Sequence, residues 1–67
     1  MAIRLLREAV EKVPQNPALH YHLGLVYRKN GEADSARGEL GEALRLNLEA
    51  VQAREARRLL REMGEGL

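Results

Sequence analysis

The chain has 67 residues, with eleven basic and ten acidic side chains, no cysteine, and two tyrosines but no phenylalanine or tryptophan. This length permits one small domain, and the lack of cysteine excludes disulfide bonds and thiolate metal sites. A net charge of +1 and little aromatic surface argue against a nucleic-acid binder. No apolar run approaches the roughly 18 residues of a membrane span, and residues 1–7 lack the apolar region of a signal peptide. We therefore expect a soluble chain, cytoplasmic if it is complete as given.

Four helices are expected, over residues 2–13, 17–30, 33–46 and 49–63. Ala, Leu, Arg and Glu dominate the sequence and favour helices. Pro14 and Pro17 separate the first two helices, because proline lacks an amide hydrogen and pushes the preceding residue out of the helical region. Asn16 is expected to cap the second helix, with Pro17 at its first position.

The other helix ends also carry sequence signals. Gly31 and Gly64 are expected to supply the left-handed residue that follows the second and fourth helices. Negative charge from Glu32 or Asp34 suits the start of the third helix, and Asn47 is expected to close it.

The spacing of apolar residues predicts which helix faces are buried. The first helix carries a stripe of Ile3, Leu6, Ala9, Val10 and Val13. The third helix carries the matching stripe of Ala36, Leu40, Ala43, Leu44 and Asn47. The second helix is apolar over a wider arc, which includes Leu19, Leu23, Leu25, Val26 and Tyr27, so we expect it to pack between two neighbours.

The sequence also repeats itself. A shift of 34 residues places Ala2, Leu6, Glu8, Ala9 and Val10 on Ala36, Leu40, Glu42, Ala43 and Leu44. The second helix returns less faithfully in the fourth at a shift of 33, which places Tyr27, Arg28 and Gly31 on Leu60, Arg61 and Gly64.

The stretch from Pro17 to Leu48 resembles the tetratricopeptide repeat (TPR). Its family pattern matches, in one register, Leu23, Gly24, Tyr27, Gly31, Ala36, Leu40 and Ala43. The chain departs from the pattern at His20, where a large apolar residue is common, and at Leu48, which replaces the repeat-ending proline seen at Pro14. Arg57 stands where the second helix has Gly24, so we expect no further helix to pack there.

The resemblance implies an all-α fold of antiparallel helix hairpins stacked as a short right-handed α-solenoid. We expect one domain over residues 1–67: the second half of a repeat (1–14), a complete repeat (17–48) and a divergent capping helix (49–64), in the order B–A–B–A. Small residues such as Gly24 and Ala36 would lie where two helices cross closely.

The resemblance further implies a protein–protein interaction module, a scaffold or adaptor that binds a partner peptide or helix on the concave face of the solenoid. The groove positions would be Ala18, Tyr21, Leu25, Arg28 and Lys29. Tyr21 and Leu25 would form an exposed apolar ridge. They occupy the positions where TPR domains that clamp a C-terminal carboxylate need Lys and Asn, so a partner of apolar or mixed character is favoured.

Two other functions remain open. The chain could be a structural unit that forms homo-oligomers through its open repeat ends, since three or more repeats are usually needed for stability. The arginines of the fourth helix could contact RNA or an acidic partner, although glutamates spaced as i, i+4 pairs favour a solvated face. These glutamates are Glu49, Glu55, Glu62 and Glu65. These arginines are Arg54, Arg57, Arg58 and Arg61.

No enzymatic activity, cofactor or metal is expected. His20 and His22 point to different sides of a helix, which favours one packed and one solvated histidine over a metal site. Ser35 is the sole serine, and no threonine or phosphate-binding glycine motif is present.

Overall fold

The computed structural model describes residues 3–64, which form four helices and no strand. The helices are α1 (Ile3–Lys12), α2 (Pro17–Lys29), α3 (Ala33–Arg45) and α4 (Ala50–Glu62). The all-α fold class predicted from the sequence is confirmed, and each helix ends within one residue of its expected bounds. Ala2, the expected start of the first helix, lies outside the described residues.

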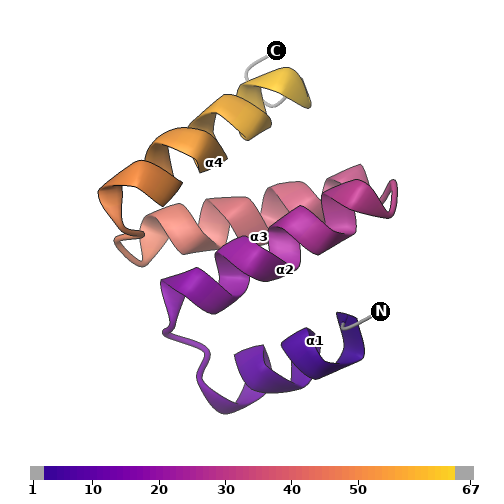
Figure 1. Ribbon diagram of the computed structural model, residues 1–67, viewed down its shortest axis with the longest axis vertical. Coiled ribbons are helices and arrows are strands. Elements are labelled where there is room, and N and C mark those ends of the chain that lie inside the picture. The colour runs from indigo at the N-terminus through magenta and orange to yellow at the C-terminus, as the bar shows by residue number, and fades with distance from the viewer. Residues whose placement is uncertain (1–2, 65–67) are drawn as a thin grey trace.

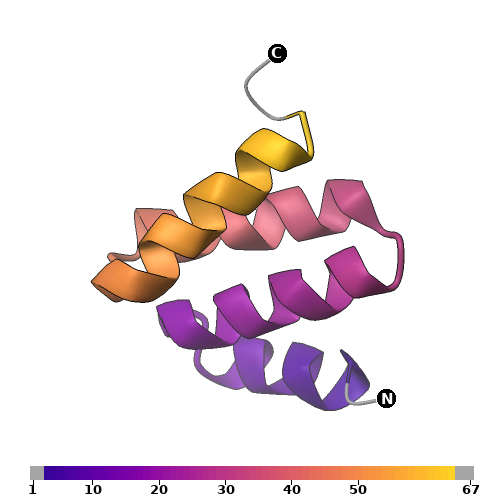
Figure 2. The same cartoon turned by 45° about the horizontal axis from the view of Figure 1, so that its top comes forward.

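The helices stack in chain order. The antiparallel hairpin of α2 and α3 forms the centre, where the packing between helices is most extensive. In Figures 1 and 2, α1 lies on one side of this hairpin and α4 lies on the other. As predicted, α2 packs between two neighbours, α1 and α3. None of the helices described here is long and apolar enough to cross a membrane.

Local signals at the helix ends act as the sequence predicted. Asn16 Oδ1 accepts hydrogen bonds from the amides of Ala18 (2.9 Å) and Leu19 (3.3 Å), which satisfies two donors that the first turn of α2 leaves without a helical partner. Gly31 and Gly64 both have φ near the left-handed region, at +80°. These residues therefore determine where α2 and α4 begin or end.

Two residues assigned to buried stripes lie elsewhere. Asn47 lies after the end of α3 and is exposed. Its φ of +66° is left-handed, so its side chain does not continue the helical spacing of the buried residues before it. Val13 is 47% exposed, because α1 ends at Lys12 and the chain turns towards Pro14. The apolar stripes of α1 and α3 are thus each one residue shorter than the sequence predicted.

The core lies around α3 and extends towards α4. Leu40, Ala36, Ala43 and Ala56 have no exposed surface. The other buried apolar residues are Tyr21, Leu23, Leu48, Ala53 and Leu59. No residue of α1 is buried, so this helix covers the hairpin without entering the core.

The close crossing of α2 and α3 depends on Gly24. A Cβ atom at this position would lie 2.8 Å from Leu40 Cγ and 3.3 Å from the Leu40 backbone nitrogen. The first distance is far below and the second slightly below ordinary van der Waals separations, so a larger residue at position 24 would force Leu40 or the helices to move. The predicted role of Gly24 as the small residue at a helix crossing is confirmed.

Candidate partner-binding surface

The five residues predicted to line a groove lie on α2, but they differ in exposure. Arg28 and Lys29 are exposed, and Ala18 and Leu25 are half-buried. Tyr21 is only 8% exposed and belongs to the central apolar cluster, against which Leu25 also packs. The expectation that Tyr21 and Leu25 form an exposed apolar ridge is therefore wrong.

Helix α4 contributes to the burial of Tyr21, together with Leu40 and Ala43 of α3. Ala53, Ala56 and Leu59 of α4 belong to the same apolar cluster as Tyr21. The two alanines are three residues apart and bring small side chains to one face of α4, which lets the helix approach closely. Burial raises the pKa of the Tyr21 phenol, and the nearby Glu55 carboxylate raises it further. Tyr21 is thus a core residue beneath the exposed residues of α2.

Charged side chains cross the junction between α2 and α4. Arg28 Nη2 lies 3.7 Å from Glu62 Oε1, and both side chains are about half exposed. Glu62 also pairs with Arg58 one turn before it, and Arg58 Nε donates to Glu55 at 3.1 Å. This network covers part of the face that the sequence assigned to a groove. The remaining accessible positions are Ala18, the outer edge of Leu25, and Lys29.

The arginines of α4 separate into two groups. Arg58 is held by glutamates on its own helix, as the interpretation of a solvated, charge-balanced face predicted. Arg54, Arg57 and Arg61 are exposed and form no ion pair within residues 3–64. Glu65, one of the expected balancing glutamates, lies outside the described residues.

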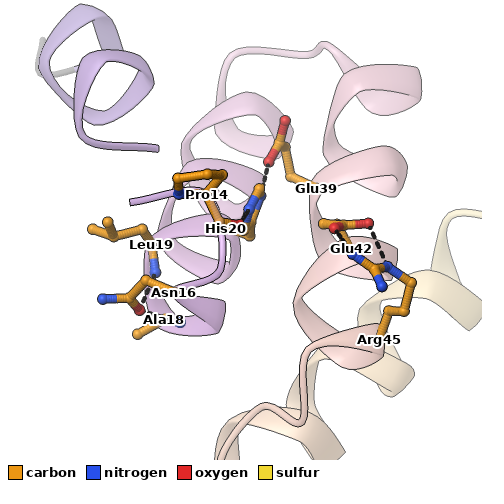
Figure 3. A network of polar contacts seen from close by, with 8 residues as sticks. All are labelled: Pro14, Asn16, Ala18, Leu19, His20, Glu39, Glu42 and Arg45. Atoms are coloured by element: carbon orange, nitrogen blue, oxygen red, sulfur yellow. Dashed lines mark hydrogen bonds and ion pairs between the residues drawn. The ribbon is translucent and has the colours of Figure 1, made fainter. Parts of the chain in front are cut away.

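A buried histidine joins three parts of the chain (Figure 3). His20 is 7% exposed. Its Nδ1 lies 2.7 Å from Glu39 Oε1 on α3, and its Nε2 lies 2.8 Å from the Pro14 carbonyl oxygen in the α1–α2 connection. A carbonyl and a carboxylate both accept hydrogen bonds, so the imidazole satisfies both partners only when both of its nitrogens carry a proton.

The surroundings of His20 favour that charged form. Burial by itself lowers the pKa of an imidazole, but the hydrogen bonds to Glu39 and Pro14 and the attraction of the Glu39 and Glu42 carboxylates outweigh burial and raise the pKa of His20 above its ordinary value. Arg45 in turn holds the pKa of Glu42 below its ordinary value through a side-chain hydrogen bond. His20 therefore links α2 to α3 and to the α1–α2 connection through hydrogen bonds, and we call this group of His20, Glu39 and Pro14 the polar fastener.

The remaining polar residues singled out in the sequence lie apart from one another. His22 is exposed, so the expectation of one packed and one solvated histidine is confirmed. Ser35 is exposed in the first turn of α3. Within residues 3–64 no group of three or more His, Cys, Asp or Glu side chains could hold a metal ion.

Sequence reasoning missed Glu39 as the partner of His20. A weak signal existed, because His20 lies one turn before Gly24 and Glu39 directly precedes Leu40, the two residues that meet at the α2–α3 crossing. A buried histidine close to such a crossing needs a polar partner from the facing helix.

One comparison with known proteins gave a match. The model of a family described as TPR repeat matches residues 1–31, the segment that contains α1, the connection with Pro14 and Asn16, and α2. The comparisons with curated proteins and with solved structures gave no match.

Proposed function

We propose that this chain binds a partner peptide or helix on the exposed face of α2. The match of residues 1–31 to the TPR repeat family supports this proposal, because TPR repeats generally mediate protein–protein interaction and are typically not enzymes. In this proposal residues 17–48 form the complete repeat, residues 1–14 the second half of a preceding one, and residues 49–64 a capping helix. The chain then acts as a scaffold or adaptor segment.

The observation that carries this proposal is the mixed character of the accessible part of α2. Ala18 and Leu25 present apolar surface, and Lys29 presents a cation one turn further along the same helix, next to Arg28, which pairs with Glu62. A partner with an apolar side chain followed by a carboxylate complements this order. Tyr21 contributes by fixing the position of Leu25 from below, because both residues pack in the same cluster.

A displayed peptide library tests this proposal. Peptides are selected on the purified chain and then measured against Ala18→Glu and Lys29→Glu. Both changes lie on helix surface, and glutamate suits the first turn of α2, where Ala18 lies, so the fold is retained. We expect each variant to weaken the selected peptides by about three- to tenfold, since such changes alter contact and charge at an interface.

Gly41→Glu is the matched control. It also adds a glutamate, but on the exposed face of α3, where a new Cβ meets no atom within 4 Å. If the selected peptides lose affinity equally on all three variants, or on none, the assignment to the face of α2 is wrong.

A second candidate function is self-assembly, favoured by the exposed apolar surface of α1. Leu5 is 67% exposed, and no residue of α1 is buried. We propose that a second copy of the chain could cover this surface. Light scattering after size exclusion tests it: Leu5→Glu should convert an oligomer into a monomer without loss of helicity. A wild-type chain that is monomeric at every concentration would end this alternative.

A further inference from the structure

A hollow lies on the α1 side of the central hairpin. It has a volume of about 260 Å³ and is lined by residues of three helices: Arg7, Val10 and Glu11 of α1, Leu23 and Tyr27 of α2, and Glu39 of α3. Leu23 and Tyr27 occupy a different stripe of α2 from Ala18, Leu25 and Lys29. The hollow is therefore separate from the surface proposed above.

Its lining combines an apolar wall with acidic ends. Leu23 is 2% exposed and forms the most buried part of the wall, with Val10 and the ring of Tyr27 beside it. Glu11 and Glu39 line the hollow from different helices, and Arg7 is the basic residue of the lining. The lining thus holds two carboxylates and one guanidinium, and the imidazole of His20, outside the lining, shares the Glu39 carboxylate at 2.7 Å.

Glu39 is a positioned acceptor. Its Oε1 is bound to His20 Nδ1 at 2.7 Å, and its side chain is 26% exposed. This hydrogen bond fixes the carboxyl group, so a ligand that contacts its accessible surface loses little conformational entropy of the protein. Glu11 is exposed and contributes a more mobile charge at the edge.

We propose that this hollow binds a lysine or arginine side chain of a partner polypeptide. The aliphatic stem of such a side chain would lie along Leu23, Val10 and Tyr27, as long cationic side chains do on apolar surface. Its charged head would reach Glu39 and Glu11, and the face of a tyrosine ring adds attraction for a cation. Arg7 and the charged form of His20 oppose the incoming charge and lower the affinity.

Two small probes that differ only in charge test this proposal on the full chain labelled with ¹⁵N. N-acetyl-lysine methylamide carries the stem and the ammonium, and N-acetyl-norleucine methylamide carries the stem alone. We expect the lysine probe to give saturable shifts of the Val10, Leu23, Tyr27 and Glu39 amides in NMR spectra, with a Kd on the order of 1 mM. The norleucine probe should bind more weakly by about two- to fivefold.

Variants with opposite expected signs sharpen the test. Glu39→Gln and Glu11→Gln should each weaken the lysine probe by about two- to fivefold, and Arg7→Ala should tighten it by a similar factor. Added salt should reduce all of these differences. Glu8→Gln and Arg4→Ala are the matched controls on the exposed surface of α1, outside the lining, and should leave the Kd unchanged within error.

Either of two results would overturn the proposal. The first is no saturable shift with the lysine probe at concentrations about tenfold above that Kd. The second is that the lysine and norleucine probes bind the wild-type chain equally and that neither glutamine variant changes the Kd of the lysine probe. Ala18→Glu and Lys29→Glu should not change binding of the lysine probe. This independence separates failure of the hollow from failure of the surface on α2.

Discussion

Helices α1 and α4 flank the same hairpin but are held to it by different interactions. Helix α4 buries Ala53, Ala56 and Leu59, and Arg37 of α3 donates a hydrogen bond to the Met63 carbonyl at its end, at 3.3 Å. Helix α1 buries no residue, and the connection that follows it is tied to His20 through the Pro14 carbonyl. Fully buried apolar residues therefore hold α4, whereas α1 is held by half-buried apolar residues and by the hydrogen bond of His20, the polar fastener, to the connection.

The largest difference should appear when one leucine is removed from each flank. Leu59→Ala in α4 should lower the free energy of unfolding by about 2–5 kcal/mol, as is usual for a fully buried leucine. Leu6→Ala in α1 should cost about 1 kcal/mol, because Leu6 is half-buried and leaves a site that solvent can enter. Urea denaturation measures both values. Equal losses would contradict the contrast between the two flanks.

The polar fastener should make the α1 flank sensitive to pH. Because the pKa of His20 is raised in the folded chain, its stabilisation is complete below the ordinary histidine pKa of about 6.5. The stabilisation is lost as the pH rises through the higher folded pKa.

Denaturation at several pH values, with hydrogen exchange read at individual amides, checks this prediction. Protection of the α1 amides and of Asn16 should fall over that pH range, while the amides of α4 should change less. In Glu39→Gln, which lacks the carboxylate charge, the pH dependence should flatten. A pH profile unchanged by Glu39→Gln would show that another group is responsible.

A methyl group added at the hairpin should weaken both flanks together. Gly24→Ala should destabilise the chain by about 1–3 kcal/mol, the usual cost of overpacking, because the new Cβ would lie 2.8 Å from Leu40 Cγ. Leu40 is fully buried and has no room to move. Thermal unfolding measures the effect. A more stable Gly24→Ala would mean that α2 and α3 separate at little cost.

The smallest expected effect has the opposite sign. Gly41→Ala should stabilise the chain by about 0.5–1 kcal/mol, because alanine favours a helix interior over glycine and a Cβ at this exposed site meets no atom within 4 Å. It touches neither flank, so the difference between Leu59→Ala and Leu6→Ala should persist in its background. A destabilised Gly41→Ala would mean that this face of α3 is covered in solution.

The amino-acid sequence alone determined the four helices, their ends and the closest helix crossing. Asn16, Gly31 and the two prolines act through the backbone within a few residues, so their effect does not depend on the rest of the fold. The repeat spacing identified Leu40, which recurs from Leu6, and the resemblance to the TPR pattern identified Gly24.

Only the tertiary structure decided which surfaces are covered and by what. Periodicity indicates that one face of α2 is apolar, but the burial of Tyr21 depends on how closely α4 approaches, which its alanines permit. In the same way, His20 is a packed residue because Glu39 and Pro14 meet it from other segments. Which residues contact each other depends on how the helices pack, and the local sequence contains little information about distances between helices.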